Sequence, residues 1–309
     1  MTVSARSRDI PRILVLGATG VTGGAMANLL DEDRSIEVVR AARRPEQVSA
    51  WQAEGKAAVV IDLNDARTFP AALAGIDRLF VMSGYTIEMV HQVKTITDAA
   101  ADAGVGFIVH LGVYSNGRET DPHFVWHELV ERYIRHSGVA WCHLHPNMFM
   151  ENLLTTQRMI DDRLYWPMGD TPVGWIAGDD LTAVGAKVLA EGPEIHAGAD
   201  YYLSTDLLDG PQTAAVLAEA LGRPIGAIVA TPDTLEAALK AGTLGLPSNI
   251  EPNYAASIVE NVRQIFDGRM AHISAVTDTV KTLLGRAPVS LGEWAGRHRD
   301  ALDADAGSR

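Results

Sequence analysis

Short apolar runs alternate with stretches of helical periodicity along the first half of the chain. The runs are apolar almost throughout rather than on every second residue, which is typical of strands buried on both faces of a parallel sheet. They cover residues 13–16, 36–41, 57–61, 79–82, 107–111 and 140–144. The segments between them place their apolar residues on one helix face. This alternation predicts an α/β fold with a Rossmann-type doubly wound parallel sheet.

One of these helices has its own boundary signals. Asp121 can cap a helix over residues 124–136, and Pro122 suits the first turn. The dipeptide Ser137-Gly138 marks its end.

Beyond residue 144 the alternation stops. Residues 146–154 fit a loop or a short helix, residues 166–175 hold two prolines and two glycines and are loop-like, and residues 212–302 are mostly helical. Residues 173–177 and 201–204 are expected to be short strands that return to the sheet. We therefore expect a Rossmann domain over residues 10–155, with 173–206 returning to its sheet. A smaller, mostly helical C-terminal lobe is expected from residues 156–172 and 207–302, and a frayed tail from 303–309.

Composition narrows the class of protein. The formal net charge of the 309 residues is -13, which disfavours a nucleic-acid partner because binding a polyanion needs a basic face. No apolar run approaches the ~20 residues that span a bilayer, and residues 1–12 lack the apolar core of a secretory signal. The single cysteine, Cys142, excludes an intrachain disulfide and fits a reducing compartment. We expect a cytoplasmic monomer or homodimer without a membrane partner.

A glycine-rich turn follows the first apolar run. Gly17 permits a tight turn, Gly20 lets the backbone approach a pyrophosphate, and Gly23 allows close packing of helix on strand. The helix that begins here offers free N–H groups and a partial positive charge to phosphates. The intervening Thr19, Val21 and Thr22 belong to the same candidate dinucleotide site. The alternative is a tight strand–helix turn that binds nothing.

The end of the second run indicates which dinucleotide binds. NAD enzymes usually place an acid there, on the ribose 2′-hydroxyl, but this run continues into Arg43 and Arg44, after Arg40. Guanidinium groups suit a 2′-phosphate, so we expect NADPH as cofactor. The alternative is that these arginines are solvated surface charges. Asp62 and Leu63, after the third run, are candidates to meet the adenine, and Asp62 could equally cap the strand end.

Three further stretches carry a family resemblance. They read LFVMSG at residues 79–84, FIVHLGVY at 107–114 and LHPNMFMEN at 144–152. Together with the glycine turn and Arg43, they resemble the NmrA-like family of atypical short-chain dehydrogenases/reductases, with His145 where arginine is usual. The likeness spans most of residues 13–225 and fades over 231–309.

The resemblance implies a chemistry. By pattern, the chain is most similar to triphenylmethane-dye reductases and NADPH:quinone oxidoreductases, which transfer hydride from NADPH to an electron-poor conjugated carbon or a quinone. No Tyr-x-x-x-Lys occurs in the sequence, which argues against ordinary alcohol dehydrogenation. Where plant ether reductases of the family carry Lys-x-x-x-Glu, this chain has His127 and Glu131.

Three residues are candidates for catalysis. The spacing of His127 and Glu131 puts them on one helix face, so His127 could orient the acceptor or donate a proton while Glu131 holds it. Tyr114, after the fifth run, is the third candidate. The alternative is a helix-surface histidine beside a solvated glutamate. We expect no metal site, although His123 extends the pair to a row at four-residue spacing.

Aromatic and small residues at strand ends complete the expected site. Ser83, Gly84 and Gly112 could let nicotinamide and acceptor approach the backbone, or simply form tight turns. An apolar pocket beyond the strand ends suits a flat aromatic substrate. Its candidate lining is Tyr85, Met148, Phe149, Trp166 and Trp175, for each of which core packing is the alternative.

Together these features predict an NADPH-dependent reductase of a quinone, dye or other conjugated aromatic acceptor. A regulator that senses the dinucleotide without catalysis is the main alternative, because a fold does not fix function. A dehydratase or isomerase with a tightly held cofactor is a third.

Overall fold

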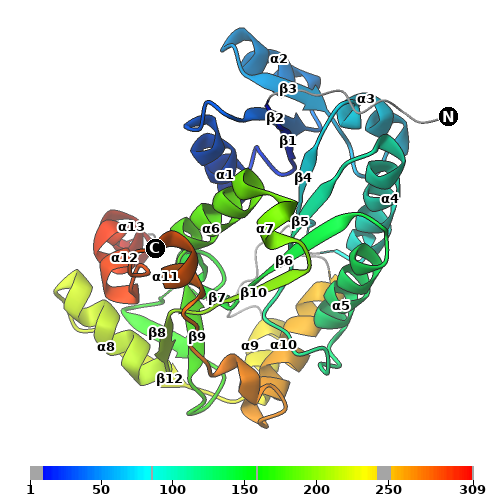
Figure 1. Cartoon of the computed structure of the whole chain (residues 1–309). Coiled ribbons are helices and arrows are strands. Elements are labelled where there is room, and N and C mark those ends of the chain that lie inside the picture. Colours follow the sequence, from blue (N-terminus) through cyan, green and yellow to red (C-terminus); the bar gives the residue numbers. More distant parts are fainter. Residues whose placement is uncertain (1–9, 85, 158, 242–251, 308–309) are drawn as a thin grey trace.

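A parallel sheet forms the centre of the computed structural model, which describes residues 10–84, 86–157, 159–241 and 252–307. Its seven strands lie in the order β10-β6-β5-β4-β1-β2-β3 (Figure 1). They are β1 (Arg12–Val15), β2 (Glu37–Ala42), β3 (Ala57–Val60), β4 (Arg78–Val81), β5 (Phe107–Leu111), β6 (Ala140–Pro146) and β10 (Ala199–Leu203). The six apolar runs are therefore strands, and the doubly wound Rossmann fold is confirmed.

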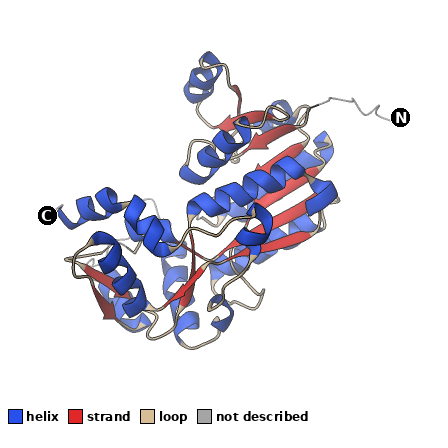
Figure 2. Cartoon of the chain, turned by 60° about the vertical axis from the view of Figure 1, so that its left-hand side comes forward, coloured by secondary structure: helices blue, strands red, loops and turns tan. Residues whose placement is uncertain are grey.

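Helices cover both faces of the sheet (Figures 1 and 2). Ile13 and Val15 belong to the core beneath α1 (Val21–Asp31) and α6 (Gly178–Glu191). Leu14 belongs to the opposite core, beneath α3 (Phe69–Leu73), α4 (Glu88–Ala103) and α5 (Pro122–Arg135). Successive strand residues thus meet two different helical layers, which is why the runs are apolar throughout. Two short helices, α2 (Pro45–Ala53) and α7 (Pro193–His196), complete the domain.

The capped helix begins where its signals place it. Asp121 is the N-cap of α5, Pro122 is its first residue, and the Phe124 N–H donates to Asp121 Oδ1 at 3.2 Å. The same oxygen accepts the Ser257 hydroxyl at 2.8 Å. Because Ser257 lies on α10 (Pro252–Phe266), the cap also ties α5 to the second lobe.

The second lobe lies in the lower part of Figure 1. It contains a parallel pair, β8 (Arg163–Trp166) with β12 (Gly226–Val229), and a three-stranded sheet of β7 (Met148–Phe149), β9 (Val173–Ile176) and β11 (Asp206–Leu208). Its helices besides α10 are α8 (Gly210–Leu221), α9 (Pro232–Lys240), α11 (Thr279–Leu284), α12 (Leu291–Arg297) and α13 (Arg299–Gly307). The expected helical character of residues 212–302 is confirmed for 212–241 and 252–302, the parts of that range that the structure describes.

The loop-like character expected for residues 166–175 is confirmed for 167–172, which form the turn between β8 and β9. Two other sequence expectations are wrong here. Residues 173–206 do not all return to the main sheet, since β10 joins it but β9 pairs with β7 and β11. The expected tail at 303–309 is helical as far as Gly307, because α13 continues from Leu302, which is buried.

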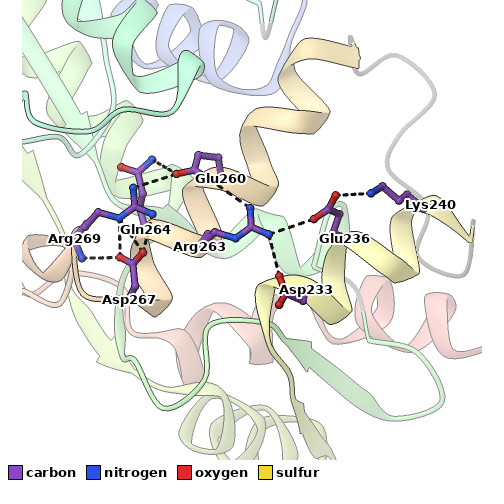
Figure 3. A network of polar contacts seen from close by, with 8 residues as sticks. All are labelled: Asp233, Glu236, Lys240, Glu260, Arg263, Gln264, Asp267 and Arg269. Atoms are coloured by element: carbon purple, nitrogen blue, oxygen red, sulfur yellow. Dashed lines mark hydrogen bonds and ion pairs between the residues drawn. The ribbon is translucent and has the colours of Figure 1, made fainter.

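An ion-pair network holds α10 against α9 (Figure 3). Arg263 on α10 donates to Asp233 at 3.0 Å and to Glu236 at 3.2 Å, both on α9. Glu260, also on α10, accepts a hydrogen bond from Arg269 at 3.2 Å. The network links α9 to α10, which contributes side chains to the site described below. No helix in the described part of the chain is long and apolar enough to cross a membrane.

Candidate functional site

The turn between β1 and α1 is built for close backbone approach. Gly17 has φ +68°, in the left-handed region, and its carbonyl accepts the Gly20 N–H at 2.8 Å. A Cβ on Gly23 would lie 2.7 Å from the Leu16 carbonyl oxygen and would collide with the Gly17 carbonyl. Glycine at these two positions is thus a steric requirement of the turn itself.

No side chain caps the backbone N–H groups at the N-terminus of α1. Gly20 is the N-cap and has no side chain, no side chain caps the helix, and its first turn holds no acid. Val21, the first helical residue, is 84% exposed. A helix N-terminus with open N–H groups and no competing carboxylate fits a pyrophosphate.

A cavity of about 660 Å³ opens beside this turn, at the carboxyl ends of the strands. Most of the predicted cofactor residues line it, namely Gly17, Thr19, Arg43, Asp62, Leu63, Ser83 and Gly84. We call it the dinucleotide cavity. Its lining also includes Asn64, Thr86, Glu88 and Gln92, which sequence reasoning missed.

The three arginines near the end of β2 have different surroundings. Arg40 is 2% exposed, pairs with Asp31 and donates to Asn28 at 3.0 Å, so it supports α1 and cannot reach a ligand. Arg43 is exposed and lines the dinucleotide cavity. Arg44 is the backbone N-cap of α2 and is absent from that lining.

Asp62 lies where either of the roles considered for it is open to it. Its carboxylate accepts the Asn64 N–H at 3.0 Å, which stabilises the turn after β3, and it also lines the dinucleotide cavity. The two interpretations are compatible.

A second cavity, of about 280 Å³, meets the first at Met82 and Ser83. We call it the acceptor cavity. Predicted residues in its lining are Thr22, Ser83, Gly112, Tyr114, His127, Met148 and Phe149. Lining residues that the sequence did not single out as ligand contacts include His123, Phe124, Asn147, Asn152, Tyr254, Asn261 and Ile265. No Asp, Glu, Lys or Arg among the described residues lines it.

His127 lies in the wall of the acceptor cavity. It is 6% exposed, and its Nδ1 is buried without a hydrogen-bond partner. Its ring packs edge-on against His123, with centroids 4.8 Å apart. Burial, followed by the neighbouring His123, His110 and His145, holds the pKa of His127 well below its ordinary value. The imidazole is therefore neutral near pH 7.

Glu131 does not hold His127, contrary to the prediction. Its Oε1 lies 3.6 Å from His145 Nδ1 and accepts no hydrogen bond, and a Cβ on Gly112 would collide with it. His127 and Glu131 lie on the same face of α5, but Glu131 is one helical turn further along, behind the wall of the acceptor cavity. The alternative of a solvated glutamate is also wrong, because Glu131 is 8% exposed and burial raises its pKa to about 7.

Tyr114 is a buried, neutral phenol in the acceptor cavity. It is 8% exposed, and its ring packs edge-on against Tyr202 at 5.1 Å between centroids. Burial raises its pKa above the ordinary value.

Trp166 and Trp175 do not line either cavity. Both are completely buried in the core of the second lobe, and Trp166 packs so closely on Gly210 that a Cβ there would lie 2.5 Å from its Cγ. The inward faces of β8 and β9 carry them into this core, so their substrate-binding assignment is wrong. Tyr85 lies outside the described residues.

The residues missed from α10 share one helix face. Tyr254, Asn261 and Ile265 follow at spacings of seven and four, which is the period of such a face. That signal was present in the sequence. What was absent was any sign that this face meets α5, more than 100 residues earlier.

The chain is similar to known proteins over almost its whole length. The chain is 29% identical over 299 residues to an NAD(P)H azoreductase of Xenophilus azovorans, covering 94% of this chain and 99% of that protein. It is 25% identical to quinone oxidoreductase 2 of Escherichia coli, over 91% of this chain and 96% of the relative. A solved triphenylmethane reductase of Citrobacter sp., complexed with NADP(H), superposes with a TM-score of 0.76 at 21% identity, over 93% of this chain and 99% of that one.

The resemblance seen in the motifs extends further than they indicated. The match to the family runs through residue 295, well past the point near residue 225 where the motifs fade. Over residues 10–295 the chain matches the NmrA-like family, and it belongs to that family.

Proposed function

We propose that the chain is an NADPH-dependent reductase of small conjugated aromatic acceptors, with a quinone as the simplest example and azo or triarylmethane dyes as further candidates. One observation carries the proposal: the dinucleotide cavity and the uncharged acceptor cavity meet at Met82 and Ser83, where a donor and an acceptor ring would be in contact. The coarser function, an NAD(P)H-dependent oxidoreductase, is supported by family membership and by the relatives named above.

The residues of the dinucleotide cavity fit NADPH. The N-terminus of α1 and the glycine turn would hold the pyrophosphate, since no side chain caps this helix and its first turn holds no acid. Arg43 would take the 2′-phosphate, and Asp62 with Leu63 would flank the adenine. Ser83, Gly84 and Gly112 would border the nicotinamide, which supplies a hydride when bound.

The acceptor cavity favours a flat, apolar ring. Met148 and Phe149 from β7 and Ile265 from α10 supply apolar surface, while Asn147, Asn152 and Asn261 supply uncharged polar groups. A lining of this kind orients an aromatic acceptor without requiring it to carry a charge.

His127 would orient the acceptor. A neutral imidazole has one N–H to donate to a carbonyl or azo nitrogen, and its low pKa leaves little imidazolium to act as an acid. The proton that completes the reduction would then come from solvent, which a quinone or a dye cation permits.

Replacing His127 tests this role. We expect His127→Ala to raise KM for 2-methyl-1,4-naphthoquinone about two- to tenfold, the cost of one neutral hydrogen bond. Turnover is followed by the loss of NADPH absorbance across pH. His136→Ala is the control, because His136 ends the same helix but is exposed. Unchanged kinetics in His127→Ala at every pH would remove the orienting role.

The competing function is a sensor that binds NADPH and catalyses nothing. A panel of quinones, azo dyes, triarylmethane dyes and enones separates the two. Tight NADPH binding without oxidation by any member of the panel would overturn the proposed reductase in favour of the sensor. Turnover of a substrate without net NADPH consumption would indicate the dehydratase or isomerase instead.

A further inference from the structure

Residues 112–114 form part of the wall of the acceptor cavity, and the backbone of this stretch, with Ser115 after it, is held by hydrogen bonds. The N–H groups of Gly112 and Tyr114 donate to the Leu144 and Pro146 carbonyls of β6 at 2.9 and 3.1 Å. Two carbonyls of the same stretch have side-chain partners. The Ser115 carbonyl accepts the Tyr202 hydroxyl at 3.2 Å, and the Val113 carbonyl meets His145 Nδ1 at 2.8 Å.

His145 is therefore placed between two acceptors. Its Nε2 lies 2.9 Å from Asp200 Oδ1, opposite the Val113 carbonyl, and the residue is 1% exposed. Its ring stacks on Tyr202, with centroids 4.5 Å apart and planes 15° from parallel. A neutral imidazole has one N–H and would set a lone pair against one of the two oxygens. Only the doubly protonated ring satisfies both contacts.

We propose that His145 is a positioning residue, which as an imidazolium held by Asp200 fixes the Val113 carbonyl and so the wall of the acceptor cavity. His145 itself lines neither cavity, so it acts through the backbone. The kinetic part of this inference rests on the proposed function, whereas the protonation of His145 does not.

The charges around His145 are consistent with a cation. Asp200 and Tyr202 face it from β10, and Glu131 and Arg135 from α5. The other nearby titratable groups are His143 on β6, His110 on β5 and His127 on α5, whose pKa values are all lowered, so these three rings are neutral. Burial lowers the pKa of His145, but the hydrogen bonds to Asp200 and the Val113 carbonyl, with the charges of Asp200 and of the partly ionised Glu131, together outweigh it, and the net shift is upward.

Two amide variants separate the two contacts. The amide nitrogen of asparagine takes the place of Nδ1, so His145→Asn keeps a donor to Val113 and loses the contact with Asp200. The amide of glutamine reaches the place of Nε2, so His145→Gln does the reverse. We expect His145→Gln to lower kcat with 2-methyl-1,4-naphthoquinone roughly ten- to a hundredfold, since a misplaced site wall disturbs the alignment of donor and acceptor. We expect His145→Asn to retain kcat within about threefold of wild type.

His196 provides a matched control. It is also 1% exposed, and its two ring nitrogens contact Tyr201 Oη at 2.7 Å and Glu191 Oε2 at 2.9 Å. It lies on α7 and lines neither cavity. His196→Asn and His196→Gln should lower the melting temperature as the His145 variants do, and should leave kcat and KM unchanged.

Two measurements do not depend on turnover. Histidine side-chain ¹⁵N–¹H spectra of the full chain at pH 7 should show two N–H protons on His145, assigned by their loss in His145→Gln. NADPH titration by fluorescence should show weaker binding in His145→Gln than in His145→Asn. A single N–H on His145, or equal kinetics and equal NADPH affinity in the two variants, would overturn the inference. A wild type that binds NADPH but reduces no acceptor would instead count against the proposed function alone.

Discussion

The arginines that end β2 show how differently neighbouring residues are used. Arg40 is enclosed by α1, Arg44 caps α2, and Arg43 faces the dinucleotide cavity. Among them only Arg43 is both exposed and next to the space where a 2′-phosphate would lie. Charge-assisted hydrogen bonds contribute about 1.5–3 kcal/mol, so we expect Arg43→Ala to weaken NADPH binding roughly ten- to a hundredfold. Fluorescence titration should show an unchanged dissociation constant for NADH.

Arg44→Ala is the control for the preference for NADPH over NADH, since it removes a neighbouring positive charge from the same surface. It should weaken NADPH binding by less than about threefold, because a solvent-exposed charge at this distance is largely screened. Equal losses for NADPH and NADH in Arg43→Ala would show that Arg43 does not contact the 2′-phosphate.

Local sequence rules predict a residue's role correctly where backbone geometry decides it. Spacing identifies Gly17 and Gly23, and the structure gives each a steric reason. The same rules fail for side chains whose role depends on distant neighbours. The sequence pattern places Trp166 and Trp175 at the substrate, yet both fill the core of the second lobe. It pairs Glu131 with His127, yet Glu131 contacts His145. Helical spacing fixes a shared face, but it does not fix what that face meets.

The β1–α1 turn has a structural role, which is to join strand and helix closely, and a proposed role in binding the pyrophosphate. Mutations at different glycines should separate the two. A Cβ on Gly23 would collide with the turn, whereas a Cβ on Gly20 would lie 3.4 Å from the Gly17 carbonyl, an ordinary contact, and Gly20 has φ -98°. We expect Gly23→Ala to lower the melting temperature and Gly20→Ala to leave it unchanged. Gly20→Ala should nevertheless weaken NADPH binding, because its methyl group would enter the space proposed for the pyrophosphate.

Thermal melts and NADPH titrations of both variants make this comparison. The opposite pattern, a destabilised Gly20→Ala with full NADPH affinity, would mean that Gly20 serves the turn and not the phosphates.

The positions of the strands along the chain can be predicted from the sequence, but the strands with which they pair cannot. The six strands of the first half were found within two residues of their observed ends, because each is buried on both faces and therefore apolar throughout. β9 has the same apolar pattern, yet it pairs with β7 and β11 outside the main sheet. A buried strand looks the same in any sheet, so its pattern cannot say which sheet it joins.

The site belongs to the whole molecule, since its parts come from both lobes. The acceptor cavity takes Gly112 from beyond β5, His127 from α5, Met148 from β7 and Tyr254 from α10. The Asp121–Ser257 bond joins α5 to α10 across 136 positions of sequence, and the network of Figure 3 joins α10 to α9. No local pattern shows that α5 and α10 meet, which is why the acceptor side of the site was harder to predict from sequence than the glycine turn.

Burial of Glu131 between these elements gives the whole molecule a pH dependence. Its folded pKa of about 7 lies above the value of about 4.3 expected in an unfolded chain. The folded state therefore holds its proton more tightly, and this stabilisation is complete below about pH 4.3 and is lost as the pH rises through 7.

Glu119 has the opposite dependence. Hydrogen bonds from His272 and Ser115 outweigh burial and lower its pKa to about 2, so its contribution is lost only on acidification.

Glu131→Gln should remove the decline in stability toward neutral pH. The amide keeps the size of the carboxyl group and cannot ionise, so we expect the unfolding free energy of wild type to fall by about 3 kcal/mol relative to the variant between pH 5 and 8. Urea unfolding at one-unit pH intervals measures this difference. Glu128→Gln is the control, because Glu128 lies on the same helix with a partly exposed side chain paired to Arg132. If the curves of wild type and Glu131→Gln run parallel across this range, Glu131 is ionised in the folded protein and the acid buried behind the cavity wall carries a charge.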